Sequence, residues 1–486
     1  LGHFSTNAYR FAPQTAQSDF GTANEAYRLM IYFEGQENSN FQTLMGGTSL
    51  KYAKNKTKLD FYASAFQSDE REYFDILGQY YINELETDPS KEAYGDSIAT
   101  LGVGGFLNHA RNRLNAQIYS IYHNGSYLIR DAYLDENKTK KRYNQLAWGA
   151  QFQSDHFNDI LSEWRLIDSS GYSLPQTEPN QIILYETIKG NLELHSWRAN
   201  AYAQWSNSWT KVNRHKAVSG QFKADGTKHS WADTLDVSTQ KFNFQLGLRG
   251  GYTHINQEPY LTPRLSFSYA PAAYMWQNGS AVRRSLLFKL STGLYYQPPF
   301  YREFRTFDGQ LALGVQAQKS FHLVAGTEFL FQMWGRQTPF KLNSELYYKY
   351  LWDVNPYEIE NVRTRYYATN NAVGYAYGLD INVHGEFVEG IQSFFKLGLL
   401  STKEDIIADQ YTNYYNAAGE RIIFGYSQDQ TVVDSAVIFP GFIPRPTDQW
   451  LTFGALVQDQ MPGYEAFKVQ MGLQYGSRLP YGPPDF

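Results

Sequence analysis

Apolar and polar residues alternate with a period of two along much of the chain. In the stretch 467–475, every odd position is apolar and every even position is polar or glycine. An amphipathic helix would instead repeat its apolar positions every three or four residues. The same alternation recurs, with few breaks, in the stretches 197–205, 242–249, 341–350 and 375–384. The pattern therefore predicts β-strands whose two faces meet different surroundings.

About 14 such strands are predicted, and most are about 9–12 residues long. Strands of soluble proteins average about 5–6 residues, whereas a tilted strand needs roughly 9–11 to cross a bilayer. Strand length therefore favours an all-β chain that folds as a transmembrane antiparallel β-barrel. The segments fall near 41–53, 58–67, 111–123, 143–154, 195–206, 240–252, 263–270, 284–296, 320–331, 340–351, 374–385, 391–402, 448–457 and 466–477.

The polar positions of these strands are expected to face an aqueous lumen. A Lys or Arg that faces lipid at mid-membrane costs about 2–4 kcal/mol, so charged positions should point inward. Aromatic residues near segment ends, such as Trp197, Trp205, Tyr350 and Tyr475, suit the interfacial girdles of a barrel. The residues predicted to face the lumen are Lys341, Asn343, Glu345, Lys349, Asp380, Asn382, Lys468 and Gln470.

The predicted strands are joined by short and long connections in turn. Outer-membrane barrels have short periplasmic turns and longer extracellular loops, so the long stretches are expected outside the cell. The connections 124–142 and 207–239 are long where a short turn is expected, which indicates missed strands or misplaced boundaries there. Short connections lie at 54–57, 335–338, 386–390 and 458–463, and long ones at 68–110, 155–194, 297–319, 352–373 and 403–447.

Composition excludes several classes of protein. The mean hydropathy is -0.51, and no apolar run approaches the roughly 20 residues of a membrane helix. The net charge of -5 argues against nucleic-acid binding, which depends on clustered Lys and Arg. The absence of Cys excludes disulfides, Cys-based zinc sites and Cys nucleophiles.

Catalytic and metal motifs are not recognised, so neither an enzyme nor a cofactor is expected. No Gly-x-Ser-x-Gly elbow is present, and the run 403–409, with its three carboxylates, lacks the spacing of a calcium loop. Several histidines are scattered without zinc spacing and are interpreted as single barrel or loop residues. These are His195, His215, His229, His254, His322 and His384.

Four stretches carry a resemblance to a known family: 295–305, 347–376, 443–449 and 479–484. Together they resemble the barrel of TonB-dependent receptors of the Bacteroidetes type. The resemblance implies a Gram-negative outer-membrane barrel of about 22 strands around an N-terminal plug. It further implies active import of a bulky, scarce nutrient with energy relayed by TonB, ExbB and ExbD. Outer-membrane lipid would surround the barrel, and a surface lipoprotein is a further partner that the resemblance leaves open.

The chain is expected to be part of a barrel domain that spans residues 1–486 and is incomplete at both ends. No plug-like region or TonB box is visible, and about 14 strands fall short of about 22. Pro483 and Pro484 cannot donate ladder hydrogen bonds, so the last residues are not expected to form a closing strand.

Two predicted extracellular stretches, 298–305 and 363–371, are candidate substrate contacts. Flat aromatic rings and amides suit sugars or peptides, and arginines suit carboxylates. The alternative is that these loops pack on themselves or on neighbours. A siderophore, an oligosaccharide, a peptide and cobalamin remain open as substrates, and a passive porin or a soluble carbohydrate-binding β-protein remains open as a function. The candidate residues are Tyr301, Arg302, Arg305, Arg365, Tyr366, Tyr367 and Asn370.

Overall fold

The computed structural model describes residues 2–168, 183–217, 234–277, 280–335, 339–360, 363–388, 391–423, 427–461 and 463–480. Seventeen strands of these residues form one sheet. Every pairing in it is antiparallel, and the main strands follow one another in chain order from β1 to β21. The fold is therefore an all-β meander, as the alternation predicted.

The first half of the sheet contains the longest strands. Its strands are β1 (Gly2–Gly21), β2 (Ala26–Lys54), β3 (Thr57–Leu85), β4 (Ser97–Tyr133), β5 (Lys140–Asp168), β6 (Glu186–Ala217), β7 (Thr234–Thr253), β8 (Glu258–Ala270) and β9 (Ala273–Gln277). The second half contains β10 (Ser280–Gln297), β11 (Gln318–Phe331), β12 (Phe340–Val354), β15 (Ala372–Val388), β16 (Ile391–Ile406), β19 (Ile443–Pro444), β20 (Leu451–Met461) and β21 (Tyr464–Gly476).

Short elements occupy the connections of the second half. A 3-10 helix, η1 (Tyr301–Phe304), follows β10. The hairpin of β13 (Tyr357–Glu360) and β14 (Arg363–Tyr366) follows β12, and the hairpin of β17 (Tyr411–Tyr415) and β18 (Asp434–Ile438) follows β16. In the described part of the chain, no helix has both the length and the apolar character needed to span a membrane.

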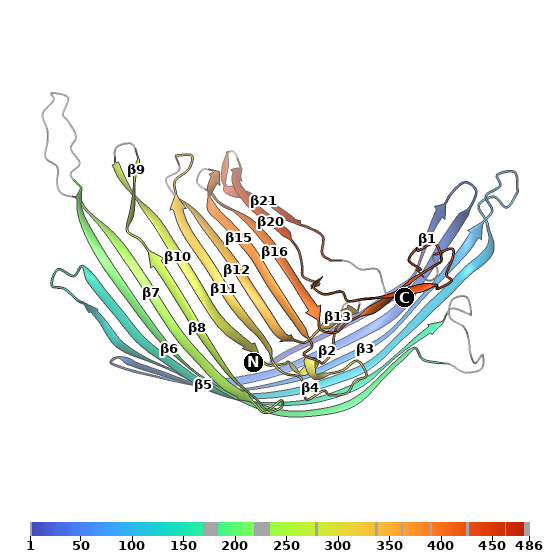
Figure 1. The fold of residues 1–486 in the computed structure, drawn as a ribbon, viewed down its shortest axis with the longest axis horizontal. Coiled ribbons are helices and arrows are strands. Elements are labelled where there is room, and N and C mark those ends of the chain that lie inside the picture. The colour runs from blue at the N-terminus through green and yellow to red at the C-terminus, as the bar shows by residue number, and fades with distance from the viewer. Residues whose placement is uncertain are drawn as a thin grey trace, which may run out of the picture.

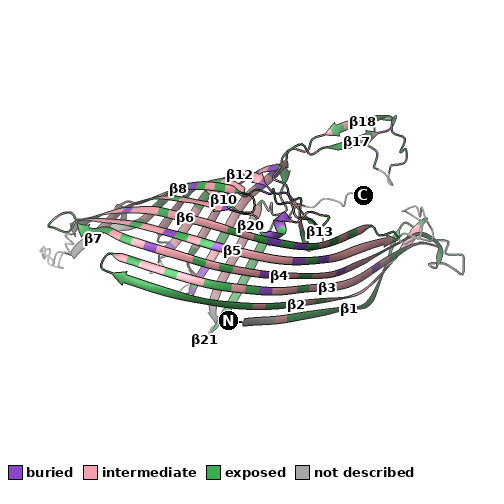
Figure 2. Ribbon diagram, turned by 90° about the horizontal axis from the view of Figure 1, so that it is seen from below, coloured by how far each residue is buried: buried purple, intermediate pink, exposed green. Residues whose placement is uncertain are grey.

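The sheet curves into a trough, and it is not closed into a barrel (Figure 1). Among the described residues, β1 pairs only with β2, and β21 pairs only with β20. The connections that carry η1 and β13 lie on the concave side of the trough (Figure 1). Strands β2 to β5 run side by side as long ribbons well past this region (Figure 2).

Each of the 14 predicted segments overlaps a different strand, but several boundaries were wrong. The stretches 68–110 and 155–194 were predicted as long loops, yet β3, β4, β5 and β6 continue through most of them. These extensions alternate less regularly than the segments that were recognised, as their mixed burial patterns show. Strand β1 was not predicted.

The first irregular connection, 124–142, is now explained. β4 and β5 extend into it and leave a turn at 134–139. The backbone amides of Thr139 and of Lys140, the first residue of β5, donate to the Asp135 carboxylate. The second, 207–239, is shortened by β6 and β7, and its residues 218–233 lie outside the described part of the chain. The predicted non-strand ending at 481–486 also lies outside it.

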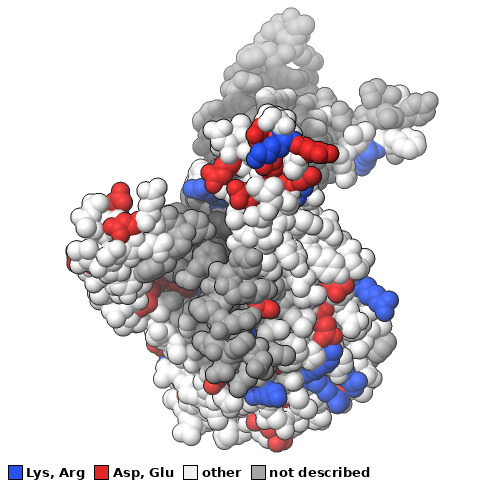
Figure 3. All heavy atoms as spheres, turned by 90° about the vertical axis from the view of Figure 1, so that its right-hand side faces the viewer, with Lys and Arg blue, Asp and Glu red and all other residues white. Residues whose placement is uncertain are grey.

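The hairpins at one end of the long strands carry mixed charge (Figure 3). Arg28 pairs with Asp19 at 2.9 Å beside the turn between β1 and β2, and Lys91 pairs with Glu86 at 2.7 Å in the turn between β3 and β4. Arg28 also donates to the Gly95 carbonyl, so the two hairpins touch. Water screens exposed pairs of this kind, so they contribute little to stability.

Candidate functional site

One face of the sheet is apolar and exposed across many strands. Leu290, Ala325, Leu346, Leu379 and Leu399 are successive cross-strand partners, so their side chains form one row on that face. Leu346 is 59% exposed, and no second layer of the described chain covers it. Such a wide exposed apolar surface requires an apolar partner outside the chain.

Aromatic rings border this apolar band on both sides. Phe321, Tyr350 and Tyr375 are cross-strand partners along one border. At the other border, the Phe331 and Phe340 rings lie 5.7 Å apart. Ten residues of β11 separate the two borders, which is roughly 34 Å along a strand and roughly 25 Å of height at a tilt of about 40°. This height and these aromatic borders match the apolar band of an outer-membrane barrel.

The polar positions predicted to face a lumen all lie on the opposite face of the sheet. The register pairs Asn343 with Asn382 and Glu345 with Asp380, and it places Lys341 and Lys349 on the same side. Lys468 and Gln470 of β21 continue this face through the pairings of β16, β20 and β21. Lys341 binds Glu328 at 2.9 Å. That this face lines water in a closed barrel stays a prediction.

The two faces exchange their character where β5 and β6 leave the apolar band. Phe152 and Trp197 lie on the outward face at the border, with their rings 6.0 Å apart. Beyond them, most outward positions of β6 are polar and those of β5 are mixed, with His156 and Glu193 as polar examples and Ile160 as an exposed apolar one. The inward positions there include buried apolar residues, Leu161, Leu192 and Leu194, among charged ones. The parts of β5 and β6 beyond Phe152 and Trp197 therefore have an outer surface in contact with water. Their inner surface has apolar side chains on which other segments can pack.

The connection from β10 to β11 packs on this inner surface. The Tyr301 ring stacks on Phe157 at 4.7 Å, and its hydroxyl donates to Asp159 Oδ2 at 2.9 Å. Arg305 Nη1 lies 3.2 Å from the same oxygen, and the Asp159 side chain is 4% exposed. Phe304 is buried in the same small core. This hydrogen bond joins Tyr301 to Asp159, which lies 142 positions earlier in the sequence.

Burial changes the acidity of two groups in η1. Burial raises the pKa of the Tyr301 phenol, and the neighbouring Asp159 carboxylate raises it further, so this hydroxyl is a donor at neutral pH. Burial also raises the pKa of Glu303, although its hydrogen bonds from the Phe300 amide and the Gln318 side chain act in the other direction. Both groups have hydrogen-bond partners inside the connection or in the neighbouring strands β5 and β11, so neither offers free charge to a ligand.

The stretch 363–371 packs against the same connection. Arg365 pairs with Glu186 of β6 at 2.7 Å and lies 4.7 Å over the Phe307 ring. Tyr367 meets Phe307 edge to face at 4.9 Å. The Asn370 side chain donates to the Gln316 and Asp353 carbonyls. The two stretches that sequence reasoning singled out therefore form one assembly at the rim of the trough.

The candidate residues differ in how far they remain available. Tyr301 is buried, and Arg305, Arg365 and Asn370 are held by internal contacts. The Arg302 side chain is 66% exposed and lies 3.6 Å from Glu70. Tyr367 is also exposed, whereas Tyr366 is half-buried beside Tyr357. Substrate contact by these residues stays a prediction.

A recess on the polar face, below this assembly, holds three arginines that sequence reasoning did not connect. Arg198, Arg249 and Arg264 come from β6, β7 and β8 and line a cavity of about 290 Å³. Tyr260, Tyr296 and the glutamines Gln151, Gln153 and Gln297 complete much of its wall. In the sequence, each arginine is an isolated polar position of a strand, and only the register brings them together.

The recess has unbalanced positive charge. None of its three arginines forms an ion pair within the described ranges. Arg249 donates to the Asn200 side chain at 2.8 Å, but its buried Nε has no hydrogen-bond partner there. The nearby Glu258 carboxylate is already bound to Lys319 at 2.7 Å. The arrangement suits a carboxylate or phosphate oxygen, which such guanidinium groups bind strongly.

No protein-family model matches the chain, and no curated protein matches it. Solved structures with similarity to it include the outer membrane transporter YddB from Escherichia coli, with 9% identity and a TM-score of 0.27 over 91% of this chain and 68% of that one. The ferric enterobactin receptor PfeA from Pseudomonas aeruginosa has 10% identity and a TM-score of 0.29 over 94% of this chain and 74% of that one.

The pyoverdine outer membrane receptor FpvA from Pseudomonas aeruginosa PAO1 is also similar, with 7% identity and a TM-score of 0.18 over 96% of this chain and 73% of that one. Similarity at this level does not define the function of this chain.

Proposed function

We propose that the chain forms part of the barrel wall of a Gram-negative outer-membrane transporter and receptor. This receptor would import a bulky, scarce nutrient. The apolar band with aromatic borders carries this proposal. Its height of roughly 25 Å fits the hydrocarbon region of such a membrane, and its opposite face is polar. Lipid is the apolar partner that the exposed row around Leu346 requires.

The inner surface supports transport rather than a purely structural role. The rim assembly places Arg302 beside the trough, and the recess below it offers Arg198, Arg249 and Arg264. A nutrient with acidic or hydrogen-bonding groups would meet the rim first and the recess next. A siderophore, an oligosaccharide, a peptide and cobalamin each carry such groups.

Energy for import would come from TonB, ExbB and ExbD through a plug domain. This part of the proposal rests on the resemblance to receptors of the Bacteroidetes type. Residues 1–486 would then supply barrel strands alone. A surface lipoprotein would be an additional partner at the rim.

A passive porin is the alternative, because it would have the same outer wall. Swelling of liposomes in solutions of small sugars separates the two functions. A porin admits small solutes without energy, whereas a plugged receptor admits them poorly. A soluble carbohydrate-binding protein is disfavoured by the apolar row on the outer face.

Two measurements test the proposal. A folded outer-membrane barrel that resists SDS should migrate differently before and after boiling, and it should require detergent for extraction. Free solubility without a mobility shift would reject the membrane wall. In cells, uptake by the full-length protein should stop when the membrane is de-energised, and uptake that continues unchanged would reject active import.

A further inference from the structure

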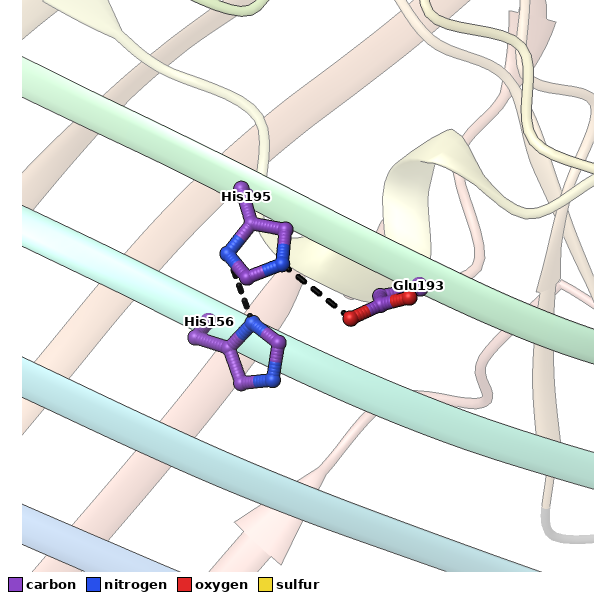
Figure 4. Close-up of side chains that lie close together, drawn as sticks. All are labelled: His156, Glu193 and His195. Atoms are coloured by element: carbon purple, nitrogen blue, oxygen red, sulfur yellow. Dashed lines mark hydrogen bonds and ion pairs between the residues drawn. The ribbon is translucent and has the colours of Figure 1, made fainter.

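Three metal-ligating side chains meet on the outward face of β5 and β6 (Figure 4). His156 and His195 are direct cross-strand partners, and their Nδ1 atoms lie 2.7 Å apart. Glu193 lies two residues from His195 on the same face, and its Oε1 is 3.1 Å from His195 Nε2. One ligand atom from each residue falls within 4.8 Å of the others.

Glu193 prepares His195 for coordination. A carboxylate can only accept here, so His195 Nε2 carries the proton and His195 Nδ1 presents its lone pair. That lone pair points at His156 Nδ1, which donates to it when no ion is bound. A cation bound to both Nδ1 atoms would displace this proton, and a neutral His156 would then carry its single ring proton on Nε2. Carboxylates that fix a ligating histidine in this way are common around metal sites.

We propose that His156 and His195 bind a divalent transition-metal ion, with Glu193 as the positioning residue. Two imidazole nitrogens suit Zn²⁺, Ni²⁺ or Cu²⁺, whereas Ca²⁺ and Mg²⁺ require oxygen ligands. The chain has no Cys, so no thiolate in it competes for the ion. Two protein ligands leave further coordination positions for water or for a ligand from outside.

The position of the site separates it from the transport surface. Trp197 lies two residues from His195 on the same face and marks the border of the apolar band. The side chains of His195 and Glu193 are 68% and 63% exposed. The ion would therefore sit just beyond the membrane border, on the outer surface. Its binding does not depend on the nutrient or on import.

Titration of the purified, detergent-solubilised chain with Cu²⁺ tests the proposal, provided that the chain carries no polyhistidine tag. We expect one ion per chain, with a paramagnetic resonance spectrum that shows two coordinated nitrogens. His156→Ala and His195→Ala should each weaken binding at least tenfold. Glu193→Gln should weaken it about tenfold and keep the two-nitrogen spectrum.

His254→Ala is the matched control, because the His254 ring stacks on Trp197 at 5.3 Å near the site. This variant should bind Cu²⁺ as the wild type does. An equal loss in His254→Ala would overturn the assignment of ligands. A wild-type titration that matches the His156→Ala/His195→Ala double variant would overturn the site itself. The substituted side chains are on the surface, and the mobility shift on boiling verifies that each variant is folded.

Discussion

The two halves of the sheet share one apolar band but differ in what lies beyond it. Strands β2 to β6 are 29, 29, 37, 29 and 32 residues long, whereas β10, β11, β12, β15 and β16 have 18, 14, 15, 17 and 16. The shorter strands end close to the band and continue as the connections that carry η1 and the β13–β14 hairpin. The longer strands continue as sheet.

The difference explains the rim assembly. The long strands provide an inner surface with apolar positions such as Leu194, and the short strands provide connections rich in aromatic residues such as Tyr301. Burial of these apolar groups against one another stabilises both. Within the band, the two-residue period therefore places apolar residues on the outward face, toward lipid. Beyond the band, it places apolar residues of the inward face in a small protein core.

A charge in the apolar band should have the largest effect. Leu346→Arg would place a guanidinium on the outward face of β12, at a cost of about 2–4 kcal/mol near mid-membrane. We expect a large fall in the yield of folded protein in lipid vesicles, measured by the mobility shift on boiling.

Two controls sharpen this test. Asn343→Arg lies on the polar face of the same strand, and Gln42→Arg lies on the outward face of β2 next to Leu44, toward the extensions. Both should fold nearly as well as the wild type. Equal yields for Leu346→Arg, Asn343→Arg and Gln42→Arg would contradict the assigned faces. They would also contradict the position of the border between the band and the extensions.

Asp159→Asn should loosen the rim assembly. The substitution removes the charge that Arg305 and Tyr301 share, and the loss of a charged hydrogen bond at a buried site costs about 1–3 kcal/mol. Cleavage of the connection 298–317 by an added protease should become about tenfold faster, since a factor of ten corresponds to about 1.4 kcal/mol.

Arg302→Ala is the comparison for that result. Arg302 is exposed and lies 3.6 Å from Glu70, so its loss should cost less than about 1 kcal/mol and barely change the cleavage rate. Faster cleavage in Arg302→Ala than in Asp159→Asn would mean that the assembly is held at its surface and not by the buried carboxylate.

Glu303 should give a smaller effect that depends on pH. Because burial raises its pKa in the folded state, the folded state binds more protons than the unfolded state between the ordinary pKa and the raised one. The stability of the connection therefore falls as the pH rises through the raised pKa. Glu303→Gln should slow amide hydrogen exchange of residues 298–317 at pH 8, after correction for intrinsic rates, and should have little effect at pH 4. Slower exchange in the wild type at pH 8 would contradict this account.

Sequence reasoning found the strands in the membrane band because lipid and water impose strict alternation there. It missed β1 and the extensions of β3 to β6, where the outward face meets water and the inward face packs only locally. It predicted the aromatic and arginine stretches at the rim, but could not predict that Tyr301 would reach Asp159. That contact depends on the curvature of the sheet.

The arginine recess and the histidine pair were missed for a related reason. Arg198, Arg249 and Arg264 are far apart in sequence, and His156 and His195 are separated by 39 positions. Each becomes part of a cluster only when the cross-strand register is fixed. The interpretation of His195 as a single histidine was wrong, because the structure places it beside His156.

The central claim is that one apolar band crosses the outward face of the sheet and that this face of β6 becomes polar at the border of the band. Since the chain has no Cys, single cysteines can be introduced along β6 and spin-labelled in lipid vesicles. Labels at 199, 201 and 203 should be relaxed by oxygen dissolved in the lipid, whereas labels at 200 and 204 should respond to a water-soluble nickel chelate. Labels at 193 and 195 should respond to the chelate although they share the outward face. Equal responses at odd and even positions, or oxygen access that continues to 193, would contradict the account.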